Sequence, residues 1–174
     1  MEKKISLVDI IEKWTRAFPG MGGYIDRERS RELDKRIRTT LAAELDAQKE
    51  AVEVVISEIV NQGRLTGLGR LGKITGKMAR LADTIRFAPH GYSIGFDPTR
   101  VDGERLAAVY AFDLGLKADL AGLTGLVSEI AEAAEKAGEK VVALDKQLDQ
   151  IDEKFKQRGA ILTSAGGADI EPSN

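Results

Sequence analysis

Long stretches of this chain carry apolar residues at every third or fourth position, and that spacing constrains its fold more than any other feature. The clearest series lies between residues 103 and 136 and reads Leu106, Val109, Asp113, Leu116, Leu120, Leu123, Val127, Ile130 and Ala134. A helix with this spacing has one apolar stripe along its length, and the stripe has to be buried against other helices. The pattern therefore predicts an all-α protein.

Similar spacing predicts helices at about residues 4–17, 25–62, 65–87 and 139–158. Breaks rich in glycine and proline separate them, among them Phe18-Pro19-Gly20 and Ala88-Pro89. Short connections favour antiparallel neighbours. We therefore predict an elongated four-helix bundle or antiparallel coiled coil. Residues 1–19 form an N-terminal amphipathic helix and hinge, residues 20–158 the bundle, and residues 159–174 a flexible tail.

Composition argues against several kinds of function. The chain has no cysteine, so it has no disulfide, thiolate metal site or cysteine nucleophile. Its 26 basic and 28 acidic residues nearly balance, which argues against a nucleic-acid binder. No apolar run is long enough for a membrane span, and no secretory signal is evident, so we expect a cytoplasmic protein. The single histidine, His90, lies in a Pro-Gly loop, and we predict no catalytic residue, metal or cofactor.

The segment from Gly67 to Lys73 matches both GxGxxG and GxxxxGK, two phosphate-binding patterns. These patterns work after a strand, whereas the segment before this one reads as a helix. Ile74 also stands where a Walker loop needs serine or threonine. Phosphate or nucleotide binding is therefore only our third hypothesis. The alternative is a glycine-rich helix start, or a kinked helix packed closely against a neighbour.

Two surfaces are candidate contact sites. Arg70, Lys73, Lys77 and Arg80 form a basic stripe opposite the apolar side of their helix. Such a stripe is either a solvated face or a contact for an anionic membrane or acidic partner. In the N-terminal segment, Trp14 and Phe18 are candidate interface residues. They could insert into lipid, but we favour docking onto the bundle or another subunit, because the polar side of this helix is not markedly basic.

Asp113 is the most informative polar residue, because it occupies a position in an apolar stripe. A buried carboxylate is costly unless it is paired. We therefore expect a basic partner from another helix, with Arg27, Arg31 and Arg86 as candidates, and a role in fixing helix register. Asp34 and Arg38, four residues apart in the long helix, have the spacing of an ordinary ion pair.

Three segments resemble a family of uncharacterised prokaryotic helical proteins that opens with Gly-Tyr and an Arg/Glu-rich helix. They are Gly23 to Arg38, Ile85 to Asp97, and Tyr110-Ala111-Phe112-Asp113. The resemblance covers about residues 20–158 and implies a helical fold without an established activity. The general plan is also similar to phage-shock-protein-A-like and ESCRT-like helical proteins, by architecture alone.

These observations favour a non-enzymatic scaffold or adaptor that acts through self-association, as a homo-oligomer, or through contacts with a protein partner. The first alternative is a membrane-peripheral protein that binds anionic lipid through residues 1–18 or 64–80. The second is a protein that binds phosphate or a nucleotide at residues 67–73.

Overall fold

The computed structural model describes residues 7–20, 30–63, 68–88, 103–132 and 137–164. These residues form helices joined by short turns, and none of them lies in a strand. The helices are α1 (Leu7–Ala17), α2 (Ser30–Asn61), α3 (Leu68–Phe87), α4 (Gly103–Glu132) and α5 (Ala137–Ser164). The prediction of an all-α protein is confirmed.

Helix ends lie close to the breaks predicted from the sequence. Gly20 and Gly63 follow α1 and α2 with φ angles of 81° and 71°, a conformation that glycine adopts at little cost. At the other end of the chain, α5 continues beyond Arg158 to Ser164, so the predicted tail begins too early. A single glycine, Gly159, costs a helix only about 1 kcal/mol relative to alanine and does not end it.

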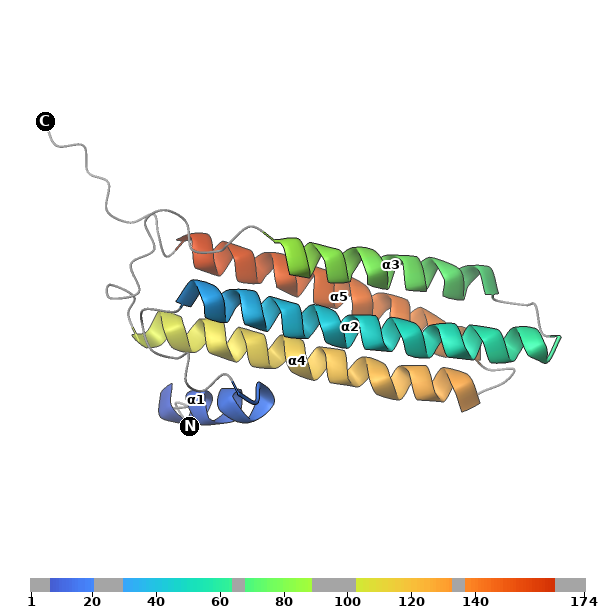
Figure 1. Cartoon of the computed structure of the whole chain (residues 1–174), viewed down its shortest axis with the longest axis horizontal. Coiled ribbons are helices and arrows are strands. Elements are labelled where there is room, and N and C mark those ends of the chain that lie inside the picture. The colour runs from blue at the N-terminus through green and yellow to red at the C-terminus, as the bar shows by residue number, and fades with distance from the viewer. Residues whose placement is uncertain (1–6, 21–29, 64–67, 89–102, 133–136, 165–174) are drawn as a thin grey trace, which may run out of the picture.

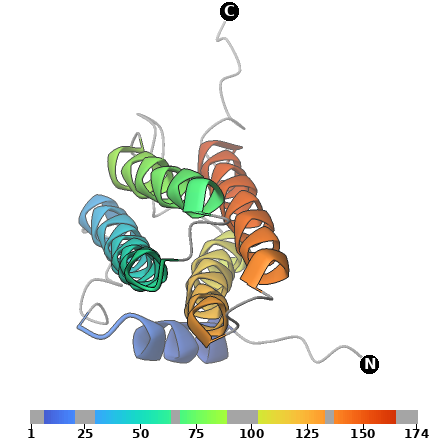
Figure 2. The same cartoon turned by 90° about the vertical axis from the view of Figure 1, so that its right-hand side faces the viewer.

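The four long helices, α2 to α5, lie side by side along the long axis, and each runs antiparallel to the next in the chain (Figure 1). Seen end-on, α2 and α5 occupy opposite corners, and each of them packs against both α3 and α4 (Figure 2). We refer to α2–α5 as the long helices. The short α1 lies across the outside of α4.

The predicted apolar stripes face one another inside this arrangement. Burying each large aliphatic side chain contributes about 1.5–3 kcal/mol, so these stripes hold the long helices together. Buried members of the stripes include Leu41, Leu45 and Val52 of α2, Leu71, Ile74 and Met78 of α3, Leu116, Leu120 and Leu123 of α4, and Leu144, Leu148 and Ile151 of α5. Asp113 lies in the α4 stripe and is buried with it.

Candidate functional site

Four charged side chains form a buried ion network at the end of the long helices where α2 begins and α5 ends. Asp34 and Arg38 come from α2, Asp113 from α4 and Arg158 from α5, and their exposed fractions are 1%, 3%, 0% and 3%. Arg158 donates hydrogen bonds from Nε to Asp113 Oδ1 at 2.6 Å and from Nη1 to Asp34 Oδ1 at 2.8 Å. Arg38 Nε donates to Asp34 Oδ2 at 2.9 Å. Two cations therefore balance two anions.

Arg38 extends this network to the fourth long helix. Its Nη1 lies 2.9 Å from the carbonyl oxygens of Arg86 and Ala88 and 3.4 Å from that of Ile85. The last carbonyls of a helix have no partner within the helix, and a basic side chain can satisfy them. Arg38 thus caps the end of α3, and the network joins all four long helices.

Burial and pairing act against each other on the charges of this network. Burial raises the pKa of Asp113, and the nearby Asp34 raises it further, although Arg158 partly opposes the shift. For Arg158, burial disfavours the charged guanidinium, but Asp113 and Asp34 outweigh it and the pKa is raised. The guanidinium is therefore charged at every accessible pH, and its position between two carboxylates is what makes their burial tolerable.

The structure places Asp113 in the core, as the sequence predicted, but with a different partner. Arg86 instead pairs with Asp46 of α2 at 2.5 Å and with Asp83 of its own helix at 2.9 Å, and it is partly exposed. It is the backbone of Arg86, rather than its side chain, that contacts the network. Arg27 lies outside the described residues, as does the side chain of Arg31.

Sequence reasoning missed Arg158, although its spacing carried a usable signal. The residue continues the apolar stripe of α5, three positions after Phe155. Asp113 occupies a stripe position in α4 in the same way. Two opposite charges at stripe positions of different helices could have suggested that Arg158 and Asp113 form a pair. Asp34 and Arg38 have the ion-pair spacing that was expected, but they lie in the core, where such a pair has far more influence than at the surface.

A second feature is the surface of α4 that α1 covers, here called the α1-binding face and defined by Tyr110 and Lys117. Trp14 and Phe18 of α1 are both 0% exposed. Their ring centroids lie 5.1 Å apart, and the ring centroids of Trp14 and Tyr110 lie 5.2 Å apart. Lys117 Nζ lies 5.6 Å from the centroid of the Phe18 ring and forms an ion pair with Glu44 of α2.

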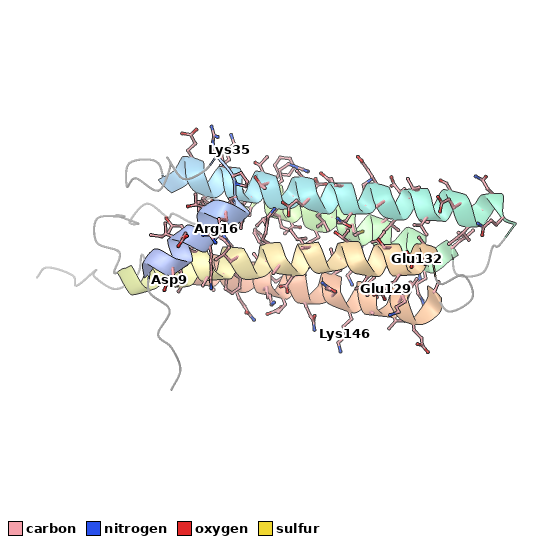
Figure 3. All side chains as sticks on the ribbon, turned by 90° about the horizontal axis from the view of Figure 1, so that it is seen from below. Asp9, Arg16, Lys35, Glu129, Glu132 and Lys146 are labelled. Carbon is pink, nitrogen blue, oxygen red and sulfur yellow. The ribbon has the colours of Figure 1, made fainter. Side chains whose placement is uncertain are left out.

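Figure 3 looks onto this side of the molecule and shows α1 crossing from α4 towards the start of α2, where Lys35 is labelled. The charged residues Asp9 and Arg16 lie on the side of α1 away from the long helices. The helix therefore buries its aromatic side and leaves its charged side in solvent, as expected for a docked amphipathic helix.

The α1-binding face lies directly over the ion network. The indole Nε1 of Trp14 is buried and has no hydrogen-bond partner among the described residues. It is nevertheless near enough to Asp113 to favour the charged carboxylate. Burial, with a contribution from Asp113, raises the pKa of Tyr110 to about 12. Burial lowers the pKa of Lys117. Asp113, Trp14 and Tyr110 therefore lie close together in a region from which water is largely excluded.

Trp14 and Phe18 were predicted as candidate interface residues that dock onto the long helices or onto another subunit, and in the structure they pack on α4 of the same chain. Both rings pack within the chain and are not exposed in this arrangement. Large aromatic side chains bury 150–250 Å² each, so the packing of these two rings contributes much of the energy that holds α1 on α4. Contact with any outside partner through these rings would require α1 to leave α4.

The predicted basic stripe on α3 is interrupted. Arg70, Lys73 and Arg80 are exposed, but Lys77 is partly buried and pairs with Asp145 and Asp149 of α5 at 2.6 and 2.7 Å. Burial disfavours the charge of Lys77, yet its hydrogen bonds to these carboxylates raise its pKa overall. Lys77 therefore joins α3 to α5 and is not a free cation for an anionic surface.

The glycine-rich segment is helical where the structure describes it. Gly69 and Gly72 lie within α3, and a Cβ added at either position would contact nothing within 4 Å. Of the two alternatives to phosphate binding, the glycine-rich helix start agrees with the beginning of α3 at Leu68, whereas close packing at Gly69 and Gly72 is not found. Gly67, the first residue of the phosphate-binding patterns, lies outside the described residues. The helix that precedes the segment is α2, as the sequence predicted.

Across the described ranges, no three His, Cys, Asp or Glu side chains are grouped so that they could hold a metal ion. None of the described helices is both long and apolar enough to cross a membrane. Comparison with known proteins found no matching family model, no matching curated protein and no matching solved structure.

Proposed function

We propose that this chain is a helical scaffold or adaptor without enzymatic activity, and that it acts by binding an amphipathic helix on its α1-binding face. In this proposal α2–α5 form an elongated antiparallel four-helix bundle. The observation that carries the proposal is the docking of α1, a separate short helix that buries two aromatic rings completely against α4. Helix-in-groove docking is a common mode of protein recognition.

The α1-binding face has the composition of a protein–protein contact. Interfaces concentrate binding energy in buried aromatic residues surrounded by groups that exclude water. Trp14, Phe18 and Tyr110 form such a centre, and the ammonium group of Lys117 lies over the Phe18 ring at its edge. An isolated helix as short as α1 is unstable in water, so the helix depends on this surface for its structure.

The same geometry gives less support to the lipid alternative. Insertion through residues 1–18 would require Trp14 and Phe18 to leave a site in which both are fully buried. Contact through residues 64–80 would use a stripe in which Lys77 is neutralised by Asp145 and Asp149. Acidic side chains beside a basic stripe reduce its attraction for anionic headgroups.

Binding of a helical peptide to the intact protein tests the proposal. The Trp14→Ala/Phe18→Ala variant of the full chain should leave the α1-binding face uncovered. A fluorescent peptide of residues 7–18 should bind this variant saturably, as measured by anisotropy. The matched peptide with both aromatic residues changed to alanine should not bind, because each ring contributes about 3–5 kcal/mol where it is fully buried.

Circular dichroism and urea unfolding establish first that the variant is folded, and Phe18→Ala alone replaces it if it is not. No saturable binding of the native peptide to a folded variant would overturn the proposal. Equal binding of the two peptides would do the same, because the aromatic pair would then not determine recognition.

A further inference from the structure

We propose that the seam between α3 and α5 opens while the other long-helix contacts stay in place, and that Lys77 is the latch that closes it. The α3–α5 seam is the contact line that includes Lys77, Leu81 and Thr84 of α3 and Leu148 and Asp152 of α5. This inference concerns a movement within the chain, and it does not depend on the binding of a helix to the α1-binding face.

The α3–α5 seam contains a cavity. Its volume is about 250 Å³, which corresponds to roughly eight water molecules. Leu81 and Leu148 line it and are 5% and 0% exposed, so the cavity reaches the apolar core. Side chains beside a cavity lack part of the packing contacts that they would make in a filled core. Packing therefore holds α3 and α5 together less firmly at this point.

The arrangement of the helices also weakens this seam. Helices α3 and α5 are not consecutive in the chain, and they run in the same direction (Figure 1). The partial charges of like sign at their ends therefore lie on the same side, which is unfavourable. The consecutive pairs α2–α3 and α4–α5 are antiparallel. Separation along the α3–α5 seam leaves both of these antiparallel pairs intact.

Lys77 supplies the ionic contact across the seam. Its Nζ lies 2.6 Å from Asp145 Oδ1 and 2.7 Å from Asp149 Oδ1. Among the described residues, the other ion pairs of α5 lead to α2 or α4 or stay within the helix, as the pair of Lys154 with Asp119 of α4 does. The two carboxylate side chains that bind Lys77 are 50% and 68% exposed. Ion pairs at such exposure are weak and are screened by salt, so this latch is easily released.

The buried ion network holds the far end of the seam. There Arg38 caps α3, and Arg158 of α5 binds Asp34 and Asp113. Buried pairs resist separation much more than exposed ones, because an unpaired charge would remain in the core. The cavity lies between this network and Lys77. Release of Lys77 therefore frees the seam up to the cavity and brings water to Leu148.

A single introduced thiol reports the opening, because the chain has no cysteine of its own. Leu148→Cys places the thiol in the seam at a position that is 0% exposed. Leu45→Cys is the matched probe, since it makes the same substitution at a 0% exposed position of α2. The rate of labelling by a soluble disulfide reagent measures how often each site opens under native conditions. We expect Leu148→Cys to react at least about tenfold faster than Leu45→Cys.

Adding Lys77→Gln to Leu148→Cys tests the latch. The labelling rate should rise about three- to tenfold, as expected from the loss of two partly exposed ion pairs. High salt should raise the rate in the same direction. Lys154→Gln is the matched control, because Lys154 also loses an interhelical ion pair but lies on the α4–α5 side. It should leave the rate close to that of Leu148→Cys alone.

Circular dichroism establishes first that each variant is folded, and Leu81→Cys replaces Leu148→Cys if the latter is not. Equal labelling at positions 148 and 45 would mean that only global unfolding exposes them and would overturn the proposal. An unchanged rate with Lys77→Gln, or an equal rise with Lys154→Gln, would do the same. None of these results affects the proposed function, which the peptide-binding experiment tests separately.

Discussion

Removing the charge of Arg158 tests the buried ion network most directly. Arg158→Met keeps an unbranched apolar stem but leaves Asp113 without its cation in a site that is 0% exposed. With charge centres about 4 Å apart and an effective dielectric constant of about 20, the lost attraction is about 4 kcal/mol. This agrees with the 3–5 kcal/mol typical when one partner of a buried pair is removed. Such a loss is a large share of the stability of a small protein.

The companion variants show whether the loss comes from an unpaired charge. Asp113→Val removes the opposite partner, and in Asp113→Val/Arg158→Met the remaining charges, Asp34 and Arg38, still form a pair. We expect the double variant to lose less stability than the sum of the two single variants, because neither buried charge is then left unpaired. Urea unfolding followed by circular dichroism measures each free energy of unfolding.

The pH dependence supplies an independent check on Arg158→Met. Burial already raises the pKa of Asp113 in the folded chain, and loss of Arg158 removes the group that opposes this shift. The folded state then binds a proton more tightly than the unfolded state, so the penalty is present at neutral pH and is relieved as pH falls through the folded pKa. A loss below about 1 kcal/mol at neutral pH, or strict additivity in the double variant, would refute the reasoning.

Three further predictions follow from the structure. Gly72→Ala should stabilise the chain by up to about 1 kcal/mol in urea unfolding, because a Cβ there meets nothing within 4 Å. Gly125→Ala should do the same in α4, whereas Gly122→Ala should gain little, because its Cβ would lie 2.6 Å from Gln147 Nε2, which donates to the carbonyl oxygen of Asp119. In an alkaline titration followed by tyrosinate absorbance, one group should titrate near a pKa of about 12 and should disappear in Tyr110→Phe. The stability that protonated Tyr110 contributes should be complete below pH 10 and be lost as pH rises through 12.

Much of the fold could be predicted from the sequence because its strongest signals are local. The apolar spacing predicted each of the five helices, and most of the predicted stripe positions that the structure describes are buried. The end of α5 was missed because Gly159 reads as a break, yet a glycine with open surroundings does not interrupt a helix that neighbouring residues support. The spacing of apolar residues along the chain does not show how strongly neighbouring residues stabilise the helix around Gly159.

The candidate site was less predictable because it depends on which helices meet. The burial of Asp113 followed from its place in a stripe, but the choice of Arg158 depends on the stagger between α4 and α5. Lys77 was assigned to a free basic stripe for the same reason. Nothing within α3 indicates that Asp145 and Asp149 lie opposite it, because that contact exists only after α3 and α5 pack together.

The buried ion network and the α1-binding face are physically connected through Asp113. The carboxylate accepts from Arg158 inside the core, and on its outer side it is close to Trp14 and Tyr110. When α1 leaves, water reaches this region. Hydration of the Asp113 carboxylate then weakens its attraction to Arg158. Docking of α1 should therefore strengthen the network by excluding water, and a weakened network should loosen α1 in turn, since coupling between two sites is reciprocal. On this reasoning, Asp113→Val should reduce the burial of Trp14, which its fluorescence would report as a shift to longer wavelength in the folded protein.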